Sequence, residues 1–200
     1  MALLAAVGLV SLAVGAWLFA GGISTQPDPS NLESTVARRL RSWMIPADAH
    51  RRPNPVPMTR EALDAGMEHF ADHCAVCHAN DGSGSIEMGE NLYPRSPDLR
   101  APATQSLSDG ALFYIIEEGV RLTGMPGWTT GTQDGELESW RLVHFIRHLP
   151  ELTDEERRRM EKLNPRSAEE WREEQEVERF LAGEDASPPN AAHDEHGGHE

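Results

Sequence analysis

The sequence has little positive charge and few aromatic side chains. Its 200 residues hold 18 lysines and arginines against 33 aspartates and glutamates, a formal net charge of −15, and aromatic residues make up 6%. Such a chain does not bind nucleic acid through the phosphates, which requires a basic surface. A partner with a basic surface is favoured instead, because opposite electric fields steer two proteins together. The length suggests one modest domain with extensions.

The negative charge is concentrated in the middle and at the end of the chain. Residues 1–58 hold five arginines against three acidic residues. Residues 59–150 hold six basic against fourteen acidic residues, and residues 151–200 hold seven against sixteen. The N-terminal part is therefore the only one of the three with a net positive charge.

Cysteine is scarce as well, and its two copies stand close together. Cys74 and Cys77 form, with His78, the pattern C-x-x-C-H, which is typical of covalent haem attachment. Each thiol can form a thioether with a haem vinyl group, and the imidazole of His78 can then bind the iron. A thioredoxin-like redox pair would need a neighbouring βαβ pattern, and a zinc site would need a second pair of ligands. The sequence offers neither, and haem attachment leaves no cysteine for a structural disulfide.

The first residues form a long apolar run. Ala2 to Ile23 carry no charged side chain, and the run is about as long as a helix that crosses a bilayer. We predict a transmembrane anchor over residues 1–23. The alternative is a signal peptide with a small-residue cleavage site at Ala20-Gly21-Gly22, although the usual positively charged start is missing. Because the arginines follow the run, they do not give its orientation.

Residues 24–58 are interpreted as a linker with a short amphipathic helix. Ser30 and Glu33 have the spacing of a capping box and predict a helix that ends near Trp43. We favour packing of its apolar face on the following domain over contact with anionic lipid. That face comprises Leu32, Val36, Leu40 and Trp43. Prolines at positions 46, 53, 55 and 57 predict a stiff spacer after the helix.

Residues 59–150 predict a helical domain around the C-x-x-C-H motif. Thr59 and Ser108 are candidate N-caps of two helices, and Thr132 or Asp134 begins another that ends at Pro150. Gly66 indicates a close helix crossing, since glycine otherwise weakens a helix. Four histidines on these helices are interpreted as surface residues: His69, His73, His144 and His148.

Together these motifs resemble those of a class I cytochrome c over about residues 59–149. The resemblance rests on the helix that carries Gly66 and Phe70, on Cys74-Ala75-Val76-Cys77-His78, on Pro97-Asp98-Leu99, on Gly124-Met125-Pro126 and on a tryptophan-rich last helix. More narrowly, the chain is similar to membrane-anchored bacterial monohaem cytochromes. The resemblance implies an all-α cytochrome c fold, with three to four helices around one haem c attached through Cys74 and Cys77. Gly66 and Phe70 would then pack against Trp140 or Phe145.

The resemblance also implies roles for residues after the motif. His78 and Met125 would bind the iron, and the thioether of Met125 would raise the reduction potential relative to a second histidine. The carbonyl group of Pro97 would accept a hydrogen bond from Nδ1 of His78, and Leu99 would pack on the haem. Candidates for contacts with the haem propionates are Trp128, Tyr93 and Arg95.

With two protein ligands on the iron, the implied function is electron transfer and not catalysis. The chain would carry single electrons between membrane or periplasmic redox partners that have a basic docking surface. Its haem domain would lie on the outer side of the cytoplasmic membrane, where bacterial c-type haem is attached. Two alternatives stay open: a haem subunit of a membrane oxidase or periplasmic dehydrogenase complex, and an enzyme or gas sensor with an open iron position.

The last fifty residues predict a charged appendage. Capping-box patterns at Thr153 and Ser167 predict two helices within a charged helical extension, residues 151–183. Residues 184–200 predict a disordered tail. Three histidines in that tail are a weak signal for copper, zinc or nickel, and a merely soluble tail is the favoured interpretation: His193, His196 and His199.

Overall fold

All regular secondary structure in the described part of the chain is helical. The computed structural model describes residues 2–19, 24–165 and 168–182, which contain helices and no strand. The predicted all-α class is therefore confirmed for these residues. The chain divides into two compact units, Met1–Leu163 and Asn164–Glu200.

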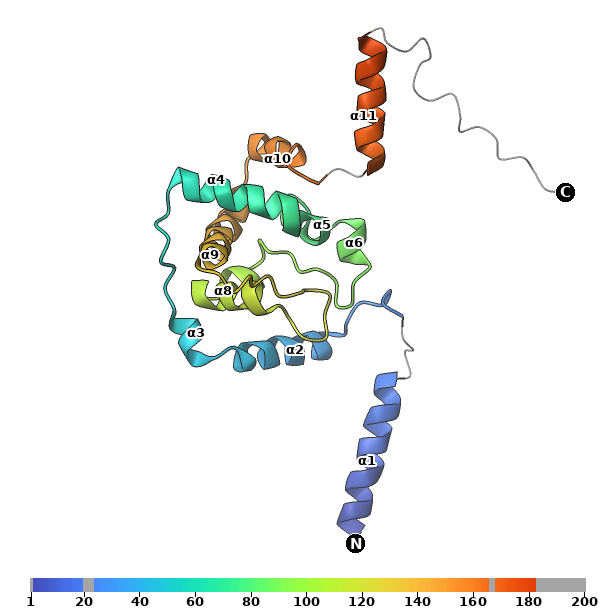
Figure 1. Cartoon of the computed structure of the whole chain (residues 1–200). Helices are drawn as coiled ribbons and strands as arrows, with labels where there is room; N and C mark the ends of the chain where they lie inside the picture. The colour runs from blue at the N-terminus through green and yellow to red at the C-terminus, as the bar shows by residue number, and fades with distance from the viewer. Residues whose placement is uncertain (1, 20–23, 166–167, 183–200) are drawn as a thin grey trace, which may run out of the picture. The chain divides into compact units, whose positions relative to one another are not determined.

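Figure 1 labels most of the helices along the chain. The first unit contains α1 (Ala2–Phe19), α2 (Asn31–Met44), α3 (Ala47–Arg51), α4 (Arg60–His69), the π-helical turn η1 (Phe70–Cys74), α5 (Ala75–His78), α6 (Glu87–Glu90), α7 (Pro102–Gln105), α8 (Asp109–Glu118), α9 (Gln133–His148), the 3-10 turn η2 (Leu149–Glu151) and α10 (Asp154–Glu161). The second unit contains α11 (Ala168–Leu181). Ser167, its predicted N-cap, and residues 184–200 lie outside the described residues.

The predicted transmembrane helix is not supported. The predicted run extends from Ala2 to Ile23, but α1 ends at Phe19 and has 18 residues, fewer than the roughly 20 that usually cross a bilayer. Among the described helices, none is long and apolar enough to span a membrane. Residues 20–23 of the predicted segment are not described.

The core of the first unit forms where α4 crosses α9. A Cβ atom placed on Gly66 of α4 would overlap the backbone oxygen of Arg141 and lie 3.1 Å from Cβ of Phe145. Next to this crossing, the rings of Phe70 and Phe145 pack with centroids 5.2 Å apart, and both are fully buried. Such a pair adds about 0.5–1.5 kcal/mol to the burial of the two rings. The predicted close crossing at Gly66 is therefore confirmed, with Phe145 as the aromatic partner.

The predicted helix starts agree with the observed caps. The side chains of Thr59, Ser108 and Thr132 each accept a hydrogen bond from the first turn of α4, α8 and α9, respectively. α8 packs on α9 through Phe113 and Trp140, whose rings stack at 4.1 Å. The guanidinium group of Arg52 lies over both rings, 4.6 Å and 5.3 Å from their centroids.

The segment before α4 lies along the haem-motif domain. The carboxylate of Asp28 pairs with Arg95 at 3.1 Å, and Ile45 is buried after the end of α2. Further along, the amide of Asn54 donates to the backbone oxygen of Trp140 at 3.0 Å. Gly110 of α8 approaches the backbone of Ala49 so closely that a Cβ atom would overlap it. The segment is thus attached to the domain at several points.

The predicted packing of the apolar face of α2 is wrong. α2 contains no buried residue, and the apolar side chains of that face are all exposed. The contacts that attach the segment lie before α2, in its first turn and after it, so they leave this face free. Its residues are Leu32, Val36, Leu40 and Trp43.

Two of the four predicted surface histidines are covered by segments that pack on α9. His144 is 7% exposed, and its Nε2 atom lies 2.8 Å from the backbone oxygen of Val56. His148 lies 3.1 Å from a carboxylate oxygen of Glu156 in α10. Their interpretation as surface residues was wrong because residues 52–57 and α10 cover this side of α9. His73 is exposed, as predicted, and His69 is half-buried.

α10 belongs to the core of the first unit. The predicted capping box is formed: the Thr153 side chain accepts from the backbone of Glu156, and the Glu156 side chain accepts from the backbone of Thr153. Met160 is fully buried in the main cluster. Arg159 pairs with two carboxylates of α4, those of Asp64 at 2.8 Å and Glu68 at 3.0 Å.

Candidate functional site

The C-x-x-C-H motif lies at the end of a helix that changes its winding just before the first cysteine. From α4 the chain continues through the π-helical turn η1 into α5. The amide of Ala75 donates to the backbone oxygen of Phe70, five residues earlier. Such turns insert one extra residue into a helix and are frequent at functional sites. Phe70 therefore stays in the core next to the crossing of α4 and α9. The extra residue rotates Cys74 and the rest of the motif to a different face of the helix. The sequence pattern alone did not reveal this turn.

The two cysteines are protonated thiols in a partly apolar setting. Neither forms a disulfide, and both are half-buried. Burial, with a smaller contribution from the neighbouring thiol, raises the pKa of Cys74 to about 12. Burial also raises the pKa of Cys77. A nucleophilic or redox-active cysteine requires a lowered pKa, so these thiols do not have the properties of a thioredoxin-like pair.

His78 is held as a neutral imidazole. Burial lowers its pKa, and the backbone carbonyl of Pro97 opposes this effect more weakly. The Nδ1 atom of His78 is buried and forms no hydrogen bond with a described residue. The Pro97 carbonyl is therefore near enough to act on the ring electrostatically, but it does not complete a hydrogen bond. When the proton of a neutral imidazole is on Nδ1, the lone pair of Nε2 is available to a metal.

The loop after His78 folds back on the motif. The amide of Gly84 donates to the backbone oxygen of His78 at 2.9 Å, and the amide of Leu99 donates to that of Gly82 at 2.8 Å. A Cβ atom on Gly89 would overlap the backbone oxygen of Cys77. These close approaches bring Pro97 to His78.

The same loop supplies Leu99 to the core. Leu99 is 9% exposed and belongs to the cluster that includes Ala75 of α5. Arg100, the next residue, pairs with Asp81 and Asp98, each at 2.9 Å. The structure thus brings together three of the predicted site residues, His78, Pro97 and Leu99.

Met125 lies on a loop that is fastened to the C-terminal end of α8. Its backbone oxygen accepts from the amide of Val120 at 3.0 Å, and its amide donates to the side chain of Thr123 at 3.1 Å. The amides of Trp128 and Thr129 donate to the backbone oxygens of Ile116 and Glu117 in α8. Met125 itself is half-buried. Its position is fixed by backbone contacts on both sides, as a ligand loop requires.

Trp128 connects the Met125 loop to the helix that carries the motif. Its ring meets that of His73 edge-on, with centroids 5.5 Å apart. Cys74, adjacent to His73, and Trp128 both pack against the main core cluster. The loop of the second predicted ligand and the helix of the first therefore meet at one place, although no contact joins Met125 and His78 directly. Sequence analysis missed His73 as a contact residue because nothing in its spacing distinguishes it from a surface histidine.

The other methionines and the other propionate candidates have different surroundings. Met58 and Met88 are exposed, and Met67 is buried in the core. Two propionate candidates bind the segment before α4: the hydroxyl of Tyr93 donates to Glu33 at 2.5 Å, and Arg95 pairs with Asp28.

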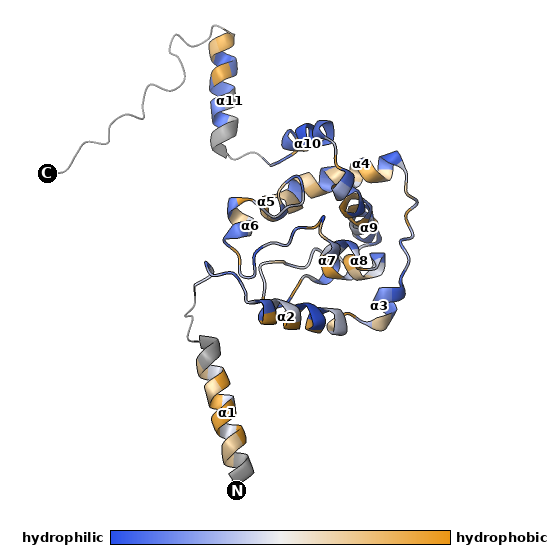
Figure 2. Cartoon of the chain, turned by 180° about the vertical axis from the view of Figure 1, so that it is seen from behind, coloured by the Kyte–Doolittle hydropathy of each residue, from blue (hydrophilic) through white to orange (hydrophobic). Residues whose placement is uncertain are grey.

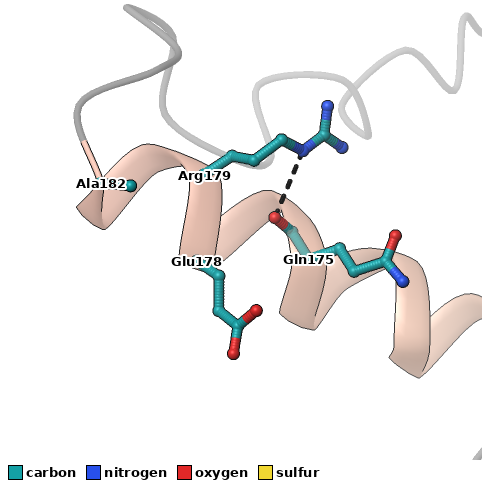
Figure 3. A pocket seen from close by; sticks show the side chains of 4 residues that line it. All are labelled: Gln175, Glu178, Arg179 and Ala182. Atoms are coloured by element: carbon teal, nitrogen blue, oxygen red, sulfur yellow. Dashed lines mark hydrogen bonds between the residues drawn. The ribbon is translucent and has the colours of Figure 1, made fainter.

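No other described part of the chain has the properties of a catalytic or metal site. The described residues contain no group of three or more histidine, cysteine, aspartate or glutamate side chains that could hold a metal ion. His193, His196 and His199 lie outside these residues. A shallow hollow on α11 is lined by Gln175, Glu178, Arg179 and Ala182, and Arg179 donates to the backbone of Gln175 at 3.3 Å (Figure 3). One helix surface forms this hollow, and it holds no group suited to redox chemistry.

The motif region fits a covalently attached haem. Two protonated thiols stand three residues apart, and a neutral imidazole follows them, with its buried Nδ1 atom directed toward a carbonyl. An apolar cluster lies beneath them, and a fixed loop carries a thioether. These are the donor types that c-type haem uses.

Comparison with known proteins agrees with this assignment. Residues 61–146 match the family described as cytochrome C oxidase, cbb3-type, subunit III. The chain is also similar to quinohemoprotein alcohol dehydrogenase ADH IIB of Pseudomonas putida, with 28% identity over 102 residues. That alignment covers 51% of this chain but only 14% of the dehydrogenase. The matched family region extends from α4 to α9, so it contains the motif and the Met125 loop. It supports a cytochrome c-type domain with haem c and haem-based electron transfer.

Proposed function

We propose that this chain is a monohaem electron carrier, with haem c attached through Cys74 and Cys77 and iron bound by His78 and Met125. The observation that carries the proposal is the setting of His78, a neutral imidazole with its buried Nδ1 directed toward Pro97 at the end of C-x-x-C-H. A haem in this site supplies reversible one-electron oxidation and reduction. The protein would hold His78 and Met125 in place as ligands and would exclude other ligands.

Each element of the site has a defined part in this proposal. The closely packed loop from Gly82 to Leu99 holds the backbone of His78, and the nearby carbonyl of Pro97 would increase the donation of its ring to a metal. The hydrogen bonds of Val120 and Thr123 hold the Met125 loop. Because both ligands would come from the protein, no ligand position would remain for a substrate, and electron transfer is the function that this arrangement would support.

Replacement of Met125 tests the proposal. We expect the oxidised, haem-loaded protein to show the weak near-infrared band of ferric haem with sulfur ligation. Met125→Ala should abolish this band, lower the reduction potential and allow the reduced protein to bind carbon monoxide, because a soft sulfur ligand stabilises ferrous iron. Met88→Ala is the matched control, since Met88 is 52% exposed and lies on α6 in the same domain.

Three results would contradict the proposed ligand pair. One is a band that persists in Met125→Ala, and another is a band that disappears in Met88→Ala. The third is ready binding of carbon monoxide by the unmodified reduced protein, which would favour an enzyme or gas sensor with an open iron position.

A second candidate function is that of a haem subunit or electron-entry domain in a larger oxidoreductase. It is favoured by the two similarities, since one is to a subunit family of an oxidase and the other is to a dehydrogenase much longer than this chain. Purification from native membranes and soluble extracts after mild crosslinking would distinguish the two. A fixed stoichiometry with a catalytic subunit would support the subunit, and recovery of the chain alone would support the mobile carrier.

We further propose that the haem domain works on the outer side of the cytoplasmic membrane, in the periplasm or the extracellular space. The support is chemical, because bacterial c-type haem is attached on that side. Protease added to intact spheroplasts should digest the haem domain. Protection of the haem domain until the cells are lysed would contradict this location.

A further inference from the structure

The apolar side chains of α2 face away from the domain to which the helix is attached. Trp43 is 84% exposed and Leu32 is 66% exposed, and Val36 and Leu40 are about half exposed. Their spacings of four, four and three residues place them on one face of the helix. In Figure 2 the ribbon of α2 alternates between hydrophobic and hydrophilic colours along its length. An amphipathic helix on a globular domain usually has the opposite orientation, with its apolar face inward.

The opposite face of α2 is polar and faces the domain. Ser34 and Arg41 are the less exposed residues of the helix, and they lie two turns apart. The orientation is fixed at both ends. Glu33 accepts from the hydroxyl of Tyr93 at the start, and Ile45 is buried directly after the end. The outward direction of the apolar face is therefore set by the attachment of the segment.

An exposed arginine lies beside this apolar face. Arg39 is exposed at the edge of the face, one turn before Trp43. Arg38 is also exposed, but it lies on the other side of the helix, near Arg41. Residues 1–58 hold five arginines against three acidic residues, in a chain whose net charge is −15. The apolar face thus belongs to the only part of the chain that an anionic surface attracts, and the rest of the chain is repelled by such a surface.

We propose that α2 docks on an anionic lipid surface, with the stripe Leu32, Val36, Leu40 and Trp43 toward the acyl chains and Arg39 at the headgroups. A helix with this distribution lies in the plane of the interface, and tryptophan is favoured at that depth. The proposal depends on the exposure and charge of α2 and holds whether or not the chain carries haem.

A second copy of the chain fits this face less well. A helix of 14 residues offers a face of about 200 Å², given about 1.5 Å per residue and a width of about 10 Å. A stable dimer buries about 800 Å² on each partner. Two facing copies would also bring the same arginine of each copy together. A lipid surface needs neither a large complementary face nor opposite charges from a protein.

The helix that precedes α2 in the chain also favours a lipid surface. α1 ends at Phe19, eleven residues before Ser30 caps α2, and its described large hydrophobic side chains are exposed. They include Val7, Leu9, Val10, Leu12 and Val14. Two consecutive helices of the chain therefore present apolar side chains without a protein partner among the described residues.

Hydrogen exchange of the full chain, followed by mass spectrometry of residues 31–44, tests the proposal. The probes are neutral phosphatidylcholine vesicles and vesicles that also contain phosphatidylserine. Because α2 buries no residue, its amides should exchange rapidly without lipid and should be protected only by the anionic vesicles. The local signal reports on α2 even if α1 brings the chain to the vesicle.

Two variants and a matched control separate the parts of the proposal. Arg39→Gln should weaken the apparent vesicle affinity of α2 about fivefold, which is the contribution of one arginine near such a surface. Leu40→Ser with Trp43→Ser should remove the protection of residues 31–44. Met58→Ser removes an equally exposed apolar side chain outside α2 and should change nothing.

Three outcomes would overturn the proposal. Equal protection by neutral and anionic vesicles would remove the role of charge. Absence of protection with both kinds of vesicle would remove the lipid surface altogether. Protection that grows with protein concentration in the absence of vesicles would identify a second copy of the chain as the occupant.

Discussion

At the residue scale, two opposing effects set the pKa of His78, the proposed iron ligand. Burial lowers the pKa of His78, and the carbonyl of Pro97 raises it by a smaller amount. The net effect favours the neutral ring, which can bind a metal without first releasing a proton. Ala79, the next residue, has a φ of 58°, a conformation that costs a residue with a Cβ atom energy. The chain reverses there, and this reversal allows the loop to return Pro97 to His78.

Gly66 allows the closest approach in the core, so its replacement should destabilise the domain. In Gly66→Ala the new Cβ atom overlaps the backbone oxygen of Arg141, which cannot move without displacing α9. We expect a loss of about 1–3 kcal/mol in the free energy of unfolding, the usual cost of overpacking. Urea titration followed by circular dichroism measures the change.

Gly8→Ala is the matched control for this substitution. Gly8 is also a helical glycine, but a Cβ atom there meets no other atom within 4 Å. Alanine should therefore be neutral or slightly favourable at this position. If both variants unfold at the same urea concentration, the helix crossing at Gly66 does not limit the stability of the domain.

At the scale of elements, the sequence predicts the helices that are marked by local signals. Ser30, Thr59, Ser108, Thr132 and Thr153 all form the expected N-caps, because a cap depends only on residues within three positions of it. The crossing at Gly66 could be predicted because a helical glycine usually has a packing reason. In the candidate site, C-x-x-C-H can also be recognised from the sequence, because its three functional residues lie within five consecutive positions.

The features that sequence did not predict depend on contacts between distant segments. His144 is buried because Val56 lies against it, and the two residues are 88 positions apart. The orientation of α2 follows from Tyr93 and Arg95, which hold Glu33 and Asp28. The π-helical turn at Phe70 shifts the register of one helix without a glycine or proline to mark it. Local patterns contain none of this information.

The attachment of α10 should make the stability of the first unit sensitive to acid. Burial raises the pKa of Glu156, but hydrogen bonds from Thr153 and His148 outweigh it, so this pKa lies below its ordinary value of 4.5. A carboxylate with a lowered pKa in the folded state stabilises the fold above its unfolded pKa. That contribution is lost as the pH falls from about 4.5 through the folded pKa.

Glu156→Gln should remove this part of the acid sensitivity. We expect it to lower the free energy of unfolding by about 1 kcal/mol at neutral pH and to have less effect below the pKa of the carboxyl group. Urea titrations at several pH values measure both effects. Glu155→Gln is the control, because Glu155 is exposed on the same helix. An equal pH profile in both variants would show that Glu156 does not link α10 to stability.

At the scale of the whole molecule, the charge is divided between two functions. The positive charge lies before residue 59, where we propose contact with anionic lipid, and the negative charge lies in the haem domain and beyond. This division would leave the acidic parts of the chain free to meet soluble partners. It also accounts for the expectation that those partners are basic, because an acidic surface lowers the energy of encounter with them.

The rate of electron exchange with a small redox reagent should therefore change with salt concentration. The charge of the reagent should decide whether the rate rises or falls. The haem-loaded protein should react with cationic hexaammineruthenium more slowly, and with anionic ferricyanide faster, as ionic strength rises from about 0.01 M to about 0.15 M. The reason is that the screening length falls from about 30 Å to about 8 Å over this range. We expect a change of about tenfold in each rate constant, measured by stopped-flow absorbance.

A chain that ends at Leu163 is the informative control, because it lacks the second unit but keeps nineteen acidic against ten basic residues after position 58. If it retains both slopes, the field that steers partners belongs to the haem domain itself. Loss of both slopes would assign that field to residues 164–200, and the same slope for both reagents would contradict electrostatic steering.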